Sequence, residues 1–351
     1  MNESIFWWAA SAADIDEDAV AAATWRQGIL TKPPGALGRL EALAIQLAGM
    51  QGHSKPEINR IDINVFAADH GVVVEGVSAF PQVVTYEMVK NFASGGAAIN
   101  VLARALGANL KVINLGTVVE AGELPGVVNH LLGPGTANIA EKPAMSDEQF
   151  QAALQVGRIA ALEAQQNKAD LFIGGEMGIG NTTSAAAICS VLLGVEAAVM
   201  AGPGTGLDSD GVLHKVTVIE KAIALHSDKL NSPAQVLQVL GGFEIAALAG
   251  SYIACAQQSM PVLVDGFISS CAALCASRMC VGSEQWFIYA HASAEPGHRI
   301  IMEGLGAEPI LDLGMRLGEG SGAAVAVTLL KQACALHNEM ATFEEAGVSE
   351  A

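Results

Sequence analysis

Short, continuously apolar runs that alternate with longer helical segments constrain the fold of this chain most strongly. Five runs are typical of buried strands, at 61–68, 109–115, 169–174, 261–265 and 285–290. Between them lie segments with helical spacing of apolar residues, near 81–106, 147–167, 181–194, 209–226, 233–258, 266–279, 296–305 and 321–340. This alternation is the pattern of a mostly parallel sheet that helices cover on both faces. We therefore predict an α/β protein.

Helical segments at the two ends of the chain fall outside this alternating pattern. One is residues 14–50, which the sequence TKPPGALGRL interrupts, and the other is the C-terminal helix at 321–340. A chain of 351 residues is longer than one average domain. We predict a large α/β domain at 60–320 and a smaller, discontinuous helical domain formed by 1–59 and 321–351.

The apolar composition raises the question of a membrane protein. Hydrophobic residues make up 51% of the chain and charged residues 15%. The longest apolar runs, 183–201 and 245–256, are interrupted by small polar residues, which is typical of buried helices and not of lipid-spanning ones. The N-terminus has no basic region, so we expect no signal peptide and a cytoplasmic protein. The six cysteines have no metal-binding spacing, which favours buried free thiols in a reducing compartment.

The charge balance argues against binding to nucleic acid. The net charge is −18, and the 18 lysines and arginines are spread along the chain. Neutralising a phosphate backbone requires clustered cations. A small anionic ligand remains compatible with this composition if a few cations and backbone N–H groups are focused on it.

Unusual residues follow the predicted strands, where a parallel sheet places its ligands. The turn GGEMGIGNTT (174–183) comes after the third strand. Gly178 and Gly180 allow its backbone N–H groups to turn inward, and Asn181, Thr182 or Thr183 is expected to cap the helix that follows. Such a helix start either binds phosphate or is a plain tight turn, because its spacing matches neither of the best-known nucleotide-binding loops.

Few cations stand near glycine-rich segments. Lys215 follows the loop AGPGTGLDSDG and is either an anion partner or a solvated helix lysine. Lys32 and Arg39, in a segment that reads mostly as structure, are further candidates for a phosphate contact. Asp69 and His70 end the first predicted strand. They form a turn cap and a core histidine, or else a metal or acid/base pair that would need a third partner such as His291.

A single carboxylate stands among glycines in GMRLGEGSGAA (314–324). Glu319 either complements the dipole of the helix that begins at about 321, or acts as a general base in a pocket. In a pocket, burial near apolar residues such as Met315 and Leu317 would favour proton uptake.

These motifs together resemble one family. KPPGALGRLE, ADHGV, GGEMGIGNTT, HKV, DGF and above all MRLGEGSGAA are similar to the nicotinate-nucleotide–dimethylbenzimidazole phosphoribosyltransferases, in the same order from about residue 30 to 340. The resemblance implies a homodimer with a Rossmann-like sheet and a small helical domain, without metal or cofactor. It also implies transfer of the phosphoribosyl group of nicotinate mononucleotide to 5,6-dimethylbenzimidazole or a related base, in cobalamin nucleotide-loop assembly.

The resemblance also implies roles for individual residues. Glu319 matches the catalytic glutamate, which acts as the general base. Matches to the nucleotide and phosphate site are Glu176, Gly178, Asn181, Lys215, Gly318 and Gly320. Matches to the base site are Phe80, Met88, Ser293, Met315 and Leu317. Phe80 and Met88 stand where relatives carry a serine and a glutamine, so the resemblance leaves the preferred base open.

Three alternative functions agree less well with these motifs. A dinucleotide-dependent oxidoreductase requires GxGxxG after the first strand, and the chain has DHGVVVEGV there. A non-catalytic nucleotide-binding protein would keep the phosphate-binding turn but have no need of Glu319. Phosphoribosyltransferases that release pyrophosphate use acidic pairs beside Mg²⁺, and no strand here ends in such a pair.

Overall fold

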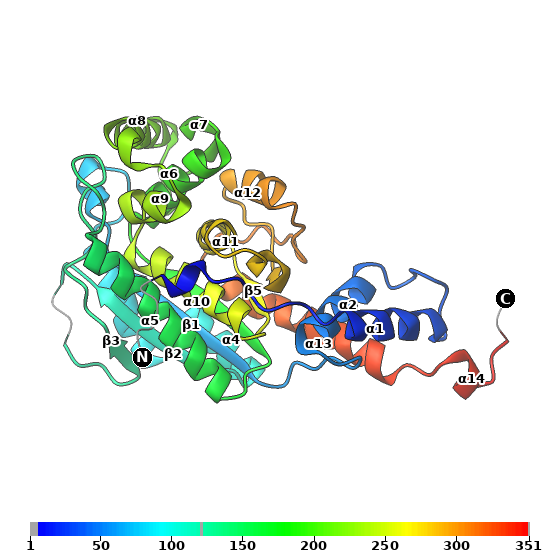
Figure 1. The fold of residues 1–351 in the computed structure, drawn as a ribbon. Helices are drawn as coiled ribbons and strands as arrows, with labels where there is room; N and C mark the ends of the chain where they lie inside the picture. The colour runs from blue at the N-terminus through cyan, green and yellow to red at the C-terminus, as the bar shows by residue number, and fades with distance from the viewer. Residues whose placement is uncertain (1–5, 120–121, 350–351) are drawn as a thin grey trace.

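A computed structural model of the chain describes residues 6–119 and 122–349. In this part of the chain one sheet contains six strands, all parallel, in the order β3-β2-β1-β4-β5-β6 (Figure 1). The strands are β1 (Ile61–Ala68), β2 (Asn109–Gly116), β3 (Val127–Asn129), β4 (Leu171–Met177), β5 (Val262–Val264) and β6 (Phe287–Tyr289). The predicted α/β class and parallel sheet are confirmed. The strand order reverses direction between β1 and β4, as in doubly wound folds.

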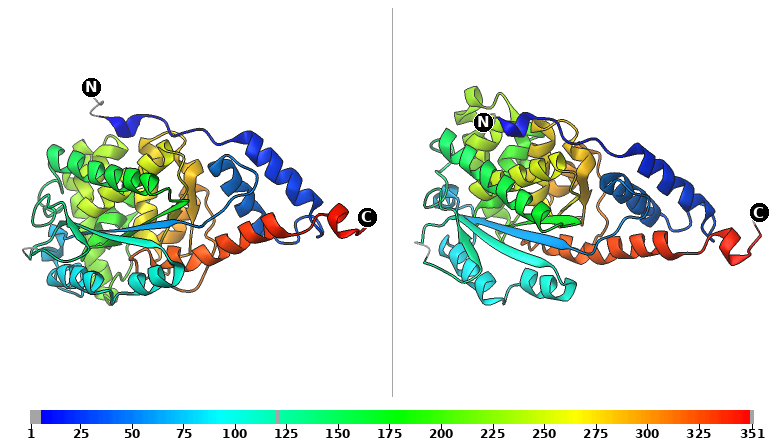
Figure 2. Two further views of the ribbon diagram at one scale, coloured as in Figure 1. Left: turned by 90° about the horizontal axis from the view of Figure 1, so that it is seen from below. Right: turned by 60° about the horizontal axis from the view of Figure 1, so that its bottom comes forward.

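Helices cover both faces of the sheet (Figure 2). One face is covered by α5 (Asp147–Gln166), α10 (Phe243–Gln257) and α11 (Phe267–Met279), and the other by α3 (Val83–Ser94), α4 (Ala98–Leu106) and the start of α13 (Ser321–Glu339). The remaining helices are α1 (Glu17–Ile29), α2 (Arg39–Gln51), α6 (Asn181–Leu193), α7 (Ala197–Met200), α8 (Ser209–Leu225), α9 (Pro233–Leu240), α12 (Gly297–Leu305) and α14 (Phe343–Ala346). Short 3-10 helices are η1 (Trp7–Ala9), η2 (Gly71–Glu75), η3 (Ser227–Lys229) and η4 (Ser283–Trp286).

Glycine pairs divide two segments that were each predicted as a single helix. The segment 81–106 forms α3 and α4, because Gly95 takes a left-handed φ of 79° and ends α3. The segment 233–258 forms α9 and α10, which Gly241 and Gly242 separate. Apolar spacing continues across both breaks, so the pattern alone hides them. The short strand β3 was also missed.

A small lobe projects from the sheet domain (Figure 1). It contains α1, α2, α14 and the outer part of α13. Helix α13 is continuous and extends from β4 in the sheet domain to α2 in the small lobe. By contrast, the segment before α1 packs on the large lobe, where the Trp286 indole donates a hydrogen bond to the Ala13 carbonyl at 2.9 Å. The predicted boundaries at 59/60 and 320/321 stay a prediction.

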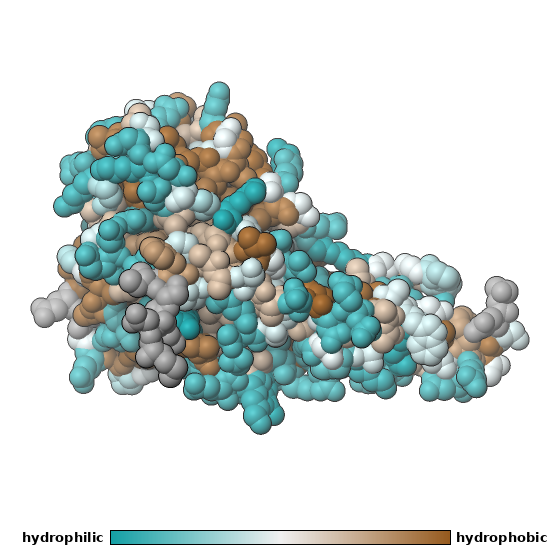
Figure 3. Space-filling view, viewed as in Figure 1, coloured by the Kyte–Doolittle hydropathy of each residue, from teal (hydrophilic) through white to brown (hydrophobic). Residues whose placement is uncertain are grey.

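The core is apolar, whereas much of the surface is polar. Every residue of β1 is buried. All six cysteines are buried and free, as predicted. Figure 3 shows hydrophilic side chains over most of one face, with apolar ones gathered near α7 and α12. Within the described residues, no helix combines the length and hydropathy needed to cross a bilayer.

Two glycines allow α5 and α10 to pack backbone to backbone. A Cβ atom at Gly157 would overlap the Ala247 carbonyl oxygen and lie 2.7 Å from the Ser251 nitrogen. On the other helix, a Cβ atom at Gly250 would lie 2.9 Å from Leu154 Cα. The crossing of these two helices therefore depends on the absence of side chains.

We expect Gly157→Ala to lower the free energy of unfolding by about 1–3 kcal/mol, because the helices must move apart. Gly28→Ala is the matched control, since Gly28 is also helical and a Cβ atom there meets nothing within 4 Å. The control should leave stability unchanged or raise it by up to about 1 kcal/mol. Denaturant unfolding of both variants measures the difference, and equal effects would contradict this view of the crossing.

Candidate functional site

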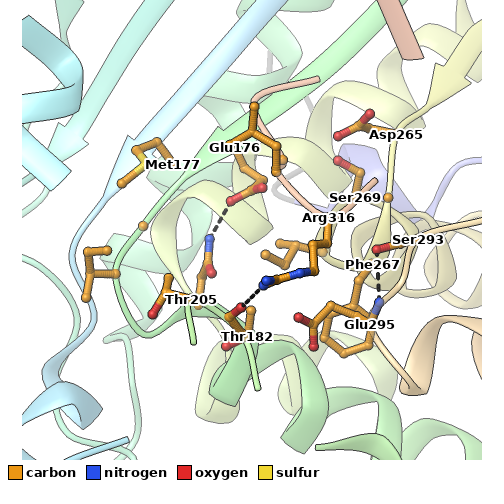
Figure 4. A pocket seen from close by; sticks show the side chains of 18 of the residues that line it. Glu176, Met177, Thr182, Thr205, Asp265, Phe267, Ser269, Ser293, Glu295 and Arg316 are labelled. Atoms are coloured by element: carbon orange, nitrogen blue, oxygen red, sulfur yellow. Dashed lines mark hydrogen bonds between the residues drawn. The ribbon is translucent and has the colours of Figure 1, made fainter. Parts of the chain in front are cut away.

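A cavity of about 490 Å³ opens beyond the carboxyl ends of β4, β5 and β6 (Figure 4). Six segments form it: the loop that carries Phe80, the β4–α6 turn, the 204–205 loop, the β5–α11 turn, the residues after β6 and the 316–318 segment. The lining residues are Phe80, Glu176, Met177, Gly178, Ile179, Asn181, Thr182, Gly204, Thr205, Asp265, Gly266, Phe267, Ile268, Ser269, His291, Ser293, Glu295, Arg316, Leu317 and Gly318. Parallel strands bring these distant segments together, because their carboxyl ends share one edge.

The glycine-rich turn delivers the start of α6 to this cavity. Gly180 precedes α6 with a left-handed φ of 96°, and no side chain caps the helix. The predicted cap by Asn181, Thr182 or Thr183 is therefore wrong. Asn181 instead donates its side-chain amide to Glu176, which is the hydrogen bond drawn as a dashed line at Glu176 in Figure 4. The first turn of α6 thus lines the cavity without a side-chain cap, as an anion site requires.

Glu176, at the end of β4, holds a proton at neutral pH. Burial raises its pKa to about 8, and the nearby carboxylates of Glu244 and Asp265 add to the shift. The hydrogen bond from Asn181 opposes this rise but does not cancel it. A neutral carboxyl group therefore lines the cavity, and it can donate a hydrogen bond to a ligand as well as accept one.

Lys215 lies directly behind the start of α6. It is fully buried, so the alternative of a solvated helix lysine is wrong. Its Nζ donates to Thr182 Oγ1 at 2.7 Å and to the Gly202 carbonyl at 3.2 Å. Burial lowers its pKa to about 8, although the negative charge of Glu295 partly opposes this. Lys215 does not line the cavity, and Thr182 stands between the two.

Glu319 is held in a left-handed backbone turn. Its φ is 65°, between 83° at Gly318 and 84° at Gly320, a conformation that costs a non-glycine residue roughly 1–2 kcal/mol. Its backbone N–H donates to the Glu176 carbonyl at 3.3 Å. Its Oε2 accepts a hydrogen bond from the Ile99 N–H at 3.2 Å, at the start of α4. These contacts fix the carboxylate next to the cavity wall formed by Gly318 and Glu176.

The Glu319 carboxylate has the properties of a proton acceptor. The side chain is 4% exposed, and burial raises its pKa above the ordinary value for glutamate. Its second oxygen, Oε1, accepts no hydrogen bond from the described residues. One oxygen is thus anchored and the other accepts no such hydrogen bond, but Glu319 itself is buried beside the cavity and is not among the residues that line it.

Most of the other predicted site residues line the cavity, but not all of them. Phe80, Ser293 and Leu317 do. Met88 packs half-buried against the core on α3, and Met315 is tied through its carbonyl to the Ala294 N–H at 3.0 Å. Gly320 precedes α13 and lies against Gly175, so its role is to shape the turn.

Asp69 and His70 belong to a buried network outside the cavity. His70 Nε2 lies 2.6 Å from Glu244 Oε1, and its Nδ1 lies 2.9 Å from Ser184 Oγ. Asp69 Oδ2 accepts a hydrogen bond from the Val118 N–H at 2.8 Å. These contacts support the structural alternative. Within the described ranges no group of three or more His, Cys, Asp or Glu side chains is placed to hold a metal.

His291 takes a different partner, since its Nε2 lies 3.7 Å from Asp265 Oδ1. Lys32 and Arg39 are also placed elsewhere: Lys32 pairs with Glu41 at 2.9 Å, and Arg39 donates to backbone carbonyls at 308–309. Neither lines the cavity of this chain, and contact of either residue with a phosphate stays a prediction.

Sequence reasoning missed three charged residues at or beside the site. Arg316 and Glu295 line the cavity, and Glu244 lies beside the Gly178 turn. Arg316 stood within a motif already singled out, and its charge in a cation-poor chain was the available signal. Glu244 lies in an otherwise apolar helix. Its negative charge was the only sequence feature that could have marked it as a site residue.

Comparisons with known proteins agree with this arrangement. A family model described as Phosphoribosyltransferase matches residues 12–348. The chain belongs to this family. It is 58% identical over 344 residues to the nicotinate-nucleotide–dimethylbenzimidazole phosphoribosyltransferase of Pseudomonas putida (strain GB-1), covering 98% of each chain. It is 56% identical over 347 residues to the enzyme of that name from Pseudomonas aeruginosa (strain UCBPP-PA14), covering 99% of each.

Solved structures extend the similarity to the three-dimensional fold. The crystal structure of CobT from Thermus thermophilus superposes with a TM-score of 0.91 at 44% identity. The match covers 95% of this chain and 100% of that one. The Rossmann-like fold that the sequence motifs implied is therefore confirmed.

The raised pKa of Glu176 predicts a pH dependence of stability. An unfolded glutamate ionises near 4.5, whereas Glu176 in the folded protein keeps its proton up to about 8. Between these values the folded state binds the extra proton, so this residue's contribution to stability falls as pH rises. The slope is at most about 1.4 kcal/mol per pH unit.

Glu176→Gln removes this titration while keeping a hydrogen-bonding amide. We expect the free energy of unfolding of the variant to decline less than that of the wild type between about pH 5 and 8. Urea unfolding at several pH values measures both curves. Parallel curves would show that Glu176 ionises normally in the folded protein.

Proposed function

We propose that this chain transfers the phosphoribosyl group of nicotinate mononucleotide to a benzimidazole-type base. The products are α-ribazole 5′-phosphate and nicotinate, a step of cobalamin nucleotide-loop assembly. The names of the relatives in this family support the substrates. The observation that carries the mechanism is the Glu319 carboxylate, which has one oxygen anchored by the Ile99 N–H and the other unpaired.

The reaction needs one proton acceptor and no proton donor. A ring nitrogen of the base attacks C1′ of the ribose while the bond from C1′ to the pyridinium nitrogen breaks. The electron pair of that bond neutralises the pyridinium, so nicotinate leaves without protonation. The other ring nitrogen of the base carries a hydrogen. This N–H becomes acidic as the new bond forms, and Glu319 accepts its proton.

The start of α6 is the proposed phosphate site. Its first turn lines the cavity without a side-chain cap, and the buried ammonium of Lys215 lies behind Thr182. Gly178 and Asn181 complete this end of the cavity. Binding the phosphate here would fix C1′ relative to the attacking nitrogen and lower the entropic part of the barrier.

The proposed base site lies on the side of Phe80 and Leu317. Both side chains line the cavity and are about half exposed, with 47% and 58% of their surface accessible. A flat aromatic base would cover them and so remove apolar surface from water. Ser293 lies further along the wall, and Met88 and Met315 would act only through the residues they support. The full set of site roles is part of the proposal.

Glu319→Gln tests the general base. The variant keeps an oxygen for the Ile99 N–H, so we expect the fold and the affinity for nicotinate mononucleotide to be preserved. The catalytic constant should fall by about 10²–10⁴-fold, because the amide accepts no proton. Steady-state kinetics with dimethylbenzimidazole, calorimetry for binding and mass identification of the nucleotide product make the measurement. Near-normal turnover would rule out this role for Glu319.

A metal-free mechanism makes a separate prediction. The proposed leaving group is a pyridine and not pyrophosphate, so no step calls for a divalent cation. We expect turnover to survive exhaustive treatment with EDTA followed by gel filtration. Loss of activity that Mg²⁺ restores would contradict this expectation.

The proposal includes a homodimer and an open choice of base. Sedimentation equilibrium should give twice the mass of one chain.

A competition among dimethylbenzimidazole, other benzimidazoles and purines, with products identified by mass, would show which base the cavity beside Phe80 prefers.

A further inference from the structure

Arg316 projects into the cavity, and it has no role in the reaction steps proposed above. It is the only lysine or arginine among the described residues that line the cavity. Its Nη1 donates to the Gly204 carbonyl at 3.0 Å, and Figure 4 shows its side chain reaching across the space. The guanidinium group therefore bridges two segments, the one that carries Glu319 and the loop opposite.

The backbone that carries Arg316 is fixed on both sides. On one side, the Ala294 N–H donates to the Met315 carbonyl at 3.0 Å. On the other side, the Glu319 N–H donates to the Glu176 carbonyl at 3.3 Å. The guanidinium group is thus presented by an anchored segment, three residues before the proposed general base.

The positive charge of Arg316 is not neutralised by an ion pair with any carboxylate among the described residues. The contact to Gly204 occupies one of the five N–H donors of a guanidinium group. Arg316 forms no ion pair with a described carboxylate, although its charge lowers the pKa of nearby Glu295. The remaining N–H donors of the planar guanidinium group face the cavity. A guanidinium group can bind a carboxylate through two parallel hydrogen bonds.

The proposed nucleotide substrate carries two anionic groups, a phosphate and the carboxylate of its pyridine ring. The cavity offers two positive features, the start of α6 backed by Lys215, and Arg316. Backbone N–H groups at a helix start suit the phosphate. We propose that Arg316 binds the ring carboxylate and thereby selects the nicotinate nucleotide over the nicotinamide nucleotide. This inference rests on the proposed function.

The same contact would favour the departure of nicotinate. In the bound nucleotide the positive pyridinium ring weakens the attraction between its carboxylate and Arg316. When the bond from C1′ to the ring nitrogen breaks, the ring becomes neutral and nicotinate carries a full negative charge. The contact is then stronger late in the reaction than at the start, so its loss should lower the catalytic constant as well as the affinity.

Arg316→Gln is the test, since glutamine keeps a donor for Gly204 but has no charge. We measure kcat/KM for nicotinate mononucleotide and for nicotinamide mononucleotide, with dimethylbenzimidazole saturating. The wild type should prefer the nicotinate nucleotide by about 10–100-fold, the value of a charge-assisted contact. In the variant this preference should fall to within about threefold, through loss of activity on the nicotinate nucleotide alone. Thermal unfolding confirms that the variant is folded.

Lys215→Met is the contrasting variant, because a phosphate contact serves both nucleotides. It should lower kcat/KM for both substrates by a similar factor and leave the preference intact. Calorimetry with nicotinate alone gives a second readout, with affinity lost in Arg316→Gln and kept in Lys215→Met.

Three results would overturn the inference. They are a wild type without preference, an unchanged preference in Arg316→Gln, or an equal loss for both nucleotides, which would assign Arg316 to the phosphate. A wild type that converts neither nucleotide would instead contradict the proposed function, so the two failures are distinguishable.

Discussion

The left-handed turn at Gly318, Glu319 and Gly320 is the constraint on which the site depends. Three consecutive positive φ angles bring a carboxylate back against the end of β4 and aim it at the first turn of α4. Only the flanking glycines adopt this backbone without strain. The strain at Glu319 is offset by its hydrogen bonds to Glu176 and Ile99. A flexible glycine-rich segment thereby becomes a fixed support for one charged group.

Burial of charge gives the site its chemical character. Carboxyl groups gather at the ends of β4 and β5, where burial raises the pKa values of Glu176, Asp265 and Glu319. One of them is neutral at physiological pH, while Glu319 combines a raised pKa with an unpaired oxygen. Two cations lie near this cluster: Lys215 is buried behind Thr182, and Arg316 reaches from the segment that carries Glu319 to the Gly204 carbonyl. Arg316 and the start of α6 therefore line the cavity, and Glu319 is buried next to its wall.

The sequence predicted those parts of the structure that depend on local pattern. The apolar run of β1 and the helix at α5 follow from spacing alone, and Glu319 was found because a charge among glycines is unusual. Contacts between distant segments left no such signal. The Ile99 N–H that anchors Glu319 lies 220 positions away, and the loop that meets Arg316 lies 112 positions away. The break at Gly241 was hidden because apolar spacing continues through it.

The most direct test of the account is a crystal structure with dimethylbenzimidazole and a non-reactive analogue of nicotinate mononucleotide both bound. The account predicts that a ring nitrogen of the base lies about 2.6–3.2 Å from Glu319 Oε1. The phosphate should then lie at the start of α6. A base bound elsewhere in the cavity, with the Glu319 carboxylate in contact only with the Ile99 N–H, would contradict it.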